Sequence, residues 1–415
     1  MSHTPALGAI EWEAESTFNE NVSTFATGRV GIINAVDLSQ LTQEKIVPGR
    51  TVQYRGEGSA YINGLKGGSI VTDMWLTGHE STTAGNTSLT TTETLLGRVF
   101  GNAAEAAAAG GTTATGGTAT VVTTTASGTF DASGAVRIGA LGDGDGEGQF
   151  YAISTHSVQN MTVLNDLAGA PVNGAIIYAP TLIYEPSAPT TSSIGGTRFR
   201  AITANLAYEL HGCHATSVTL SGFNVGEPPK ASITWDVGEH FPVGSVTFPS
   251  AVTAVTANPA ACCAGTLHIQ DVGTTTRNVV DIVDLQITYN LQTQRVDGYG
   301  SPWQYSGKRA AFRTHDNNTP PVTISFKLAA DAQTATPTFG AAWLTTTPKI
   351  MVITCSIADG SAIGFVFRRC FWTGPLPTQE DFNGRNTRTY TLCAHVDTTS
   401  TATDRSRAPM LYLSA

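Results

Sequence analysis

LAYELHGCHATSVTLSGFNVGEPPKASITWDV, residues 206–237, is the stretch that decides the fold of this chain. Val218 and Leu220 flank a polar Thr219, and Ile233 and Trp235 resume the same alternation after a gap. Side chains that alternate with period two lie on opposite faces of a β-strand. The gap holds glycines, an asparagine and two adjacent prolines, which are residues typical of turns. The stretch therefore predicts an antiparallel hairpin or a hairpin-like connection.

Length and composition predict a multidomain protein with a weakly charged surface. The chain has 415 residues, which is enough for two or three domains of about 150 residues each, with a sizeable core. Only 13% of the residues are charged, so small and hydroxylated side chains must cover much of the surface. Such a surface can be buried against copies of itself with little desolvation of charge.

Charge and cysteine usage exclude several classes of function. The formal net charge is −9, which argues against tight binding of a phosphate backbone, because that requires clustered Lys and Arg. The six cysteines form neither a CxxC motif nor a zinc-type spacing, so we expect free thiols in a reducing cytoplasm and no metal site. The sequence predicts no signal peptide, and its apolar runs fall short of the roughly 18 residues of a membrane helix.

Strand patterns dominate the first hundred residues. Residues 1–27 show no period, and we expect them to form an arm that contacts a neighbouring subunit. From Val30 onward, short strand-like runs are separated by Gly and Pro. The exception is LTTTETLLGRVFG, residues 89–101, where Thr90 and Glu93 fit a capping box and an apolar stripe ends at Gly101. This segment predicts one amphipathic helix packed on strands.

The rest of the chain divides into an insert and a second domain. Residues 102–129 are low in complexity and are interpreted as the base of an inserted subdomain, whereas residues 130–184 predict a small barrel of five or six short strands. The predicted organisation is an arm (1–27), a first domain (28–101 and 190–245), the insert with its linker (102–189) and a second domain (246–415). ASITWDV (231–237) and VTISFKL (322–328) share one pattern, which indicates an internal duplication.

No motif in the sequence predicts catalysis or a bound cofactor. GDGDGEG, residues 142–148, lacks the later Glu and the flanking helices of an EF-hand, so it is interpreted as a solvated turn. His211 and His214 are expected on opposite strand faces, and Cys213 between them is expected to be a buried structural residue. The GxSxG, P-loop and GxGxxG motifs are missing. We therefore expect no enzyme, and we expect Arg368 and Arg369 to pair with carboxylates across a subunit interface.

The order of several stretches resembles the tail tube (major tail) proteins of long-tailed, non-contractile bacteriophages. In residues 206–237, an aromatic strand leads through Gly212-Cys213 to SVTLS, a GEPP turn and an outgoing strand. The opening is similar in order, with VDLS (36–39), KIVP (45–48), GLKG (64–67) and the helix that ends at Gly101. VDLQITYNLQTQRVDGYG (283–300) and the closing strands from IADG (357–360) through DFNG (381–384) also resemble the family. These stretches cover most of the chain outside residues 102–190.

The resemblance implies a mainly all-β protein of the antiparallel β-sandwich or barrel tail-tube fold. Two tandem tube domains, a flanking helix and the inserted small β-barrel are expected. Subunits of this family form stacked rings, either hexamers or, for a two-domain chain, trimers that are pseudo-hexameric. The lumen first holds the tape-measure protein and later lets double-stranded DNA pass without specific binding. Further implied partners are the tail terminator and the tail-tip or baseplate proteins, in a virion assembled in the host cytoplasm; no cofactor and no membrane insertion are implied.

The residues expected at assembly contacts come from the arm, from two inner hairpins and from the basic pair. They are Trp12, Phe18, Tyr54, Arg55, Tyr61, Leu285, Ile287, Tyr289, Arg295, Arg368 and Arg369. Two alternatives remain open. A β-rich receptor-binding or carbohydrate-binding virion surface protein predicts a site with exposed aromatic side chains, and a tail terminator or capsid decoration protein predicts a single capped ring.

Overall fold

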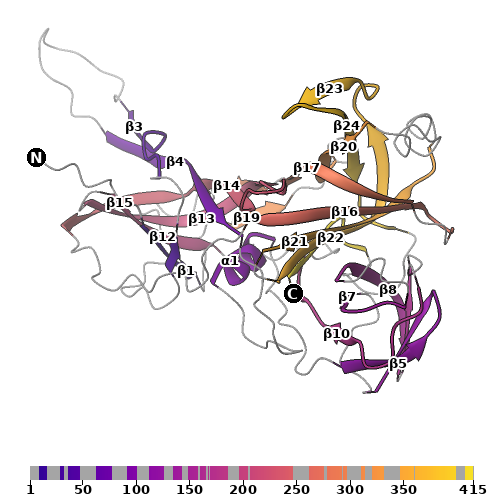
Figure 1. Ribbon diagram of the computed structural model, residues 1–415. Coiled ribbons are helices and arrows are strands. Elements are labelled where there is room, and N and C mark those ends of the chain that lie inside the picture. The colour runs from indigo at the N-terminus through magenta and orange to yellow at the C-terminus, as the bar shows by residue number, and fades with distance from the viewer. Residues whose placement is uncertain are drawn as a thin grey trace, which may run out of the picture.

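The fold consists almost entirely of antiparallel strands (Figure 1). The computed structural model describes residues 9–15, 29–31, 36–46, 62–76, 91–100, 112–125, 134–142, 148–157, 159–164, 167, 169–185, 196–203, 206–245, 261–274, 278–291, 293–296, 310–313, 320–330, 346–358, 360–398 and 407–414. Within these ranges the chain forms 25 strands and a single helix. One large sheet and one closed small barrel contain nearly all of the strands, which confirms the predicted all-β class with an inserted barrel.

Six strands close into the small barrel at the lower right of Figure 1. In barrel order they are β10 (Ile176–Tyr178), β5 (Thr112–Gly117), β6 (Val121–Thr124), β9 (Asn160–Val163), β8 (Phe150–Ser157) and β7 (Ala135–Ile138). The barrel begins earlier than residue 130, inside the low-complexity segment, because Ala114 and Val122 belong to its apolar core. It ends before β11 (Thr181–Tyr184), since that strand pairs in the large sheet with β25 (Leu411–Ser414).

The C-terminal part of the large sheet closes into a second ring of strands. Its members are β16 (Cys262–Asp271), β17 (Asn278–Asn290), β20 (Val322–Ala329), β24 (Arg385–Ala394), β22 (Ala362–Thr373) and β21 (Lys349–Ile357). Each pairs with the next, and β21 pairs back with β16. Outside this C-terminal ring, β23 (Gln379–Phe382) pairs with β24, and β18 (Thr293–Val296) pairs with β19 (Ala310–Arg313). Ring closure leaves few open edges in this half.

The predicted hairpin at residues 206–237 is present as β13 (Leu206–Ser221) and β14 (Lys230–Val237). β13 changes partners at Gly212, where φ is 59°, a value that glycine adopts without steric cost. Before Gly212, β13 pairs with β12 (Thr197–Thr203) and β15 (Glu239–Ser245); after it, β13 pairs with β14 and β17. The far edge of β14 pairs with β4 (Ile62–Trp75), which also pairs with β3 (Thr42–Ile46).

Part of the expected N-terminal arm is a strand of the large sheet. β1 (Ala9–Ala14) pairs with β12 and with β2 (Arg29–Gly31). A period of two is in fact present over these few residues, since Ile10 and Trp12 are buried in the core between glutamates. Glu11 lies on the opposite face, 3.3 Å from Arg200 of β12. The run was too short to stand out among the irregular residues around it.

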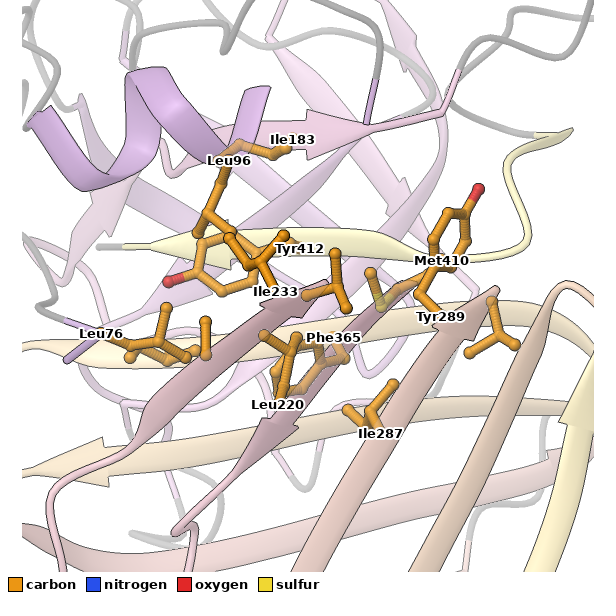
Figure 2. Close-up of a cluster of buried hydrophobic side chains, with 14 of the residues drawn as sticks. Leu76, Leu96, Ile183, Leu220, Ile233, Ile287, Tyr289, Phe365, Met410 and Tyr412 are labelled. Carbon is orange, nitrogen blue, oxygen red and sulfur yellow. The ribbon is translucent and has the colours of Figure 1, made fainter. Parts of the chain in front are cut away.

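The predicted helix is α1 (Thr91–Phe100), and it packs against the core of the large sheet. Leu96 lies in one buried cluster with Ile183 and Tyr412 (Figure 2). The Phe100 ring meets the Tyr289 ring edge-on, with centroids 4.8 Å apart. Burying one such side chain stabilises a fold by about 1.5–3 kcal/mol, so α1 is a packing element, as predicted. In the described part of the chain, no helix is long and apolar enough to cross a membrane.

Buried contacts fix the small barrel to the C-terminal ring. Arg368 of β22 donates hydrogen bonds to the carbonyl oxygens of Gly134 and Ile153, at 3.4 and 3.2 Å. The backbone amide of Phe150 donates to the Thr354 hydroxyl at 3.0 Å. Between β8 and β22, Phe150 occupies the space in front of a glycine, Gly364. The barrel is therefore docked on strands that come much later in the sequence.

Candidate assembly surface

Six strands of the large sheet form one continuous surface across both predicted domains. They pair in the order β4, β14, β13, β17, β20 and β24, and the contact between β13 and β17 joins the N-terminal and C-terminal segments. The register aligns one side chain from each strand into a buried row that faces the core. This row contains Thr72, Ile233, Val218, Tyr289, Val322 and Ala394. Its strict alignment shows that the strands share one core.

The opposite side of these six strands carries short polar side chains, and we call it the hydroxyl face. Its members are partly exposed: Asp73, Ser217, Thr219, Ser232, Thr234, Thr288, Thr323, Ser325, Thr391 and Cys393. The hydroxyl oxygens of Thr219 and Thr288 lie 3.5 Å apart across the β13–β17 contact. Short side chains dominate this face, and the exposed Gln286 and Lys230 are longer groups that lie on it. The hydroxyl face is thus suited to weak, exchangeable contacts.

Charged groups at one margin of the hydroxyl face are paired within the chain. Lys327 lies 3.6 Å from Glu380 and over the Phe382 ring, 4.3 Å from its centroid. Burial raises the pKa of Asp284, and the nearby Lys327 offsets only part of this effect. Because tight binding of a phosphate backbone requires several free cations, this margin does not provide a nucleic-acid site.

The hydroxyl face ends at β4, whose outer edge has no strand partner over part of its length in the described part of the chain. From Ser69 to Trp75, β4 is paired with β14 on one side and with no other strand among those described. Val71 in this stretch is 47% exposed. Figure 1 shows β3 and the start of β4 projecting away from the body. An open edge presents backbone N–H and C=O groups that can pair with another chain, so β4 is the candidate assembly edge.

The three apolar residues predicted for the second inner hairpin lie in the core of the chain. Leu285, Ile287 and Tyr289 are buried, whereas Gln286 and Thr288 between them face outward. The period-two alternation of β17 explains this, since the apolar side of a one-sided strand turns inward. The outward residues of β17 are therefore the surface candidates, and the sequence pattern already distinguished them.

Five of the predicted assembly residues lie where the structure describes no side chain. Arg295 lies in β18, where the backbone alone is described, and Phe18, Tyr54, Arg55 and Tyr61 lie outside the described residues. The acidic residues of the 142–148 turn, at 143–147, also lie outside them.

Arg368 and Arg369 lie on opposite strand faces, and the partners that the structure gives them belong to the same chain. Arg368 reaches the small barrel, and burial lowers its pKa to about 10, with a partial offset from Asp397. Arg369 lies 3.8 Å from Asp397 and over the Phe371 ring. Arg368 therefore docks the small barrel, whereas Arg369 pairs with residues of the C-terminal part of the chain. The sequence neighbours of the two arginines gave no signal of these roles.

The His/Cys segment of β13 forms no catalytic arrangement. Cys213 is fully buried, and burial raises the pKa of its thiol well above the usual value, as expected for a structural cysteine. His214 lies 3.4 Å from Asp236, which is in register with Ser69. Asp236 is therefore the middle residue of the row His214, Asp236 and Ser69. In a catalytic triad the histidine is the middle residue, between the acid and the nucleophile. Among the described residues, no cluster of His, Cys, Asp and Glu could hold a metal ion.

Comparison with known proteins assigns no function to this chain, so the proposal below is argued from the hydroxyl face and the β4 edge. No family model matches the chain, and the search of curated proteins found no match.

Proposed function

We propose that this chain is the tail tube subunit of a long-tailed, non-contractile bacteriophage or of a related phage-derived particle. The observation that carries the proposal is the hydroxyl face with an open edge on β4. A neighbouring copy completes such a sheet by adding a strand to the edge, and repetition around an axis closes a ring. In the ring, the hydroxyl faces of successive copies line a channel.

The chemistry of this lining supports the proposed contents of the channel. A tape-measure protein must leave the lumen, and double-stranded DNA must then slide through it. Both steps require a wall that holds neither partner tightly. The hydroxyl face presents mainly short hydroxyl groups, and the chain carries a net charge of −9, so phosphate groups meet no cation cluster there.

The order of strands supports a ring built from chains with two tube domains. β4, β14 and β13 form one half of the surface, and β17, β20 and β24 form the other. β14 and β20, whose sequences share a pattern, occupy the middle position of their respective halves. Three such chains would give a pseudo-hexameric ring, and we therefore favour the trimer over the hexamer.

Electron microscopy of the purified protein tests the proposal. We expect rings or short tubes with an open channel, formed in a concentration-dependent way or after seeding with tail initiators. Val71→Lys should block assembly, because a charge beside an open edge opposes strand addition. The matched control is Val172→Lys on the small barrel, where the valine is 41% exposed. Figure 1 shows this barrel at the opposite side of the molecule from β3 and the start of β4. Compact monomers under every condition, or normal tubes from Val71→Lys, would refute the proposal.

The carbohydrate-binding alternative finds less support. It predicts several exposed aromatic side chains, and no Trp, Tyr or Phe whose burial the structure describes is exposed. Glycan-array binding by a non-assembling protein would reverse this preference.

A further inference from the structure

The hairpin of β23 and β24 contains an unusual backbone position. Asn383 has a φ of 54° and is the one non-glycine residue with a positive φ among the described residues. Gly384 follows with a φ of 76°. Phe382 pairs directly with Arg385, so Asn383 and Gly384 alone form the turn. This is the two-residue turn that Asn-Gly favours, and both residues are exposed.

An exposed Asn-Gly pair is chemically reactive toward loss of the side-chain amide. The Gly384 backbone nitrogen loses its proton and attacks Cγ of Asn383, and the carboxamide C–N bond breaks to release ammonia. Water then opens the cyclic imide at one of its two carbonyl groups, which gives aspartate or isoaspartate. Either product replaces a neutral amide with a carboxylate, and isoaspartate also lengthens the backbone of the two-residue turn by one atom.

We propose that Asp381 protects Asn383 from this conversion. The Gly384 amide, which is the required nucleophile, donates a hydrogen bond to Asp381 Oδ1 at 2.9 Å. While this bond holds, the N–H is directed at the carboxylate and away from Asn383 Cγ. Deprotonation is also opposed, because it would place a second negative charge beside the carboxylate. The inference concerns the exposed hairpin alone and does not depend on the proposed function.

A second Asn-Gly pair provides a reference within the same molecule. Asn173 and Gly174 are exposed on the small barrel. The Gly174 amide donates to the backbone oxygen of Ala114 at 2.8 Å. Because this acceptor belongs to the backbone, no substitution at Asp381 removes it. The rate at Asn173 therefore reports general loosening of the protein.

The experiment follows both sites during incubation of the full chain in mildly alkaline buffer. Digestion and mass spectrometry measure the mass gain of each Asn-Gly peptide, and the free peptide QEDFNGRNTR (379–388) gives the unprotected rate. We expect slow conversion of Asn383 in the wild type and a several-fold faster conversion in Asp381→Ala, approaching the free peptide. Asp381→Asn keeps an acceptor oxygen but loses the negative charge, so its rate should lie between those of the wild type and Asp381→Ala.

Two results would overturn the inference. One is an equal rate at Asn383 in the wild type and in Asp381→Ala. The other is an equal acceleration at Asn173, since this would assign the effect to loosening of the whole fold.

Discussion

Replacing Gly364 by alanine should strain the contact between the small barrel and the C-terminal ring. A Cβ at this position would lie 2.4 Å from Cδ2 and 2.8 Å from Cε2 of Phe150. It would also lie 3.0 Å from the carbonyl oxygen of Ile353. The Phe150 ring is fully buried and cannot swing into solvent. Overpacking of this kind costs about 1–3 kcal/mol, and the better strand propensity of alanine returns roughly 0.5–1 kcal/mol. The net loss is therefore between about 0 and 2.5 kcal/mol, and we expect a value of about 1 kcal/mol.

Urea unfolding followed by intrinsic fluorescence measures the loss in free energy of unfolding. Faster amide hydrogen exchange in β8 would show that the loss arises at the contact between the small barrel and the C-terminal ring. Gly265→Ala in β16 is the matched control, because its Cβ would meet Ile282 at an ordinary 3.4 Å; it should cause no loss. Phe150→Leu should cost less in the Gly364→Ala background than in the wild type, since the two positions are coupled. Wild-type stability of Gly364→Ala, or an equal loss in Gly265→Ala, would refute the packing argument.

Three further predictions concern single side chains. Arg368→Met should lower the free energy of unfolding by about 1–3 kcal/mol, since buried carbonyl groups lose their donor, whereas Arg369→Met should cost under about 1 kcal/mol; equal losses in urea titrations would contradict this. Burial alone would raise the pKa of Glu209, but the hydrogen bond and charge of Arg200 lower it on balance. This carboxyl therefore stabilises the fold above its unfolded pKa of about 4.5, and the stabilisation is lost as pH falls through the lowered folded pKa. Glu209→Gln should flatten the acid side of the plot of unfolding free energy against pH, and an unchanged plot would count against the pairing. Cys263 is the exposed cysteine, so it should react first with a thiol reagent in the native protein, and Cys263→Ser should abolish that fast phase.

Local patterns predicted the elements of this fold more reliably than their partners. The hairpin at 206–237 and the helix ending near Gly101 were identified from alternation, turn residues and a capping pattern, each of which acts over a few positions. The small barrel starts earlier than the sequence pattern predicts, because its first strand is built from Thr, Ala and Gly, which resemble a linker. The candidate surface could be predicted only in part from the sequence. The alternation in β17 predicts that Gln286 and Thr288 point outward, but it does not show which strands lie on either side of β17.

By itself, the sequence determined that the chain is mainly β, where most strands turn, and which face of each strand is apolar, because these properties depend on neighbouring residues. Only the tertiary structure decided that β13 pairs with β17, that Arg368 and Gly364 hold the small barrel, and that, among the described strands, β14 alone pairs with β4 from Ser69 to Trp75. Such choices depend on which apolar faces and backbone edges fit together in space, and residues far apart in the chain contribute to them together.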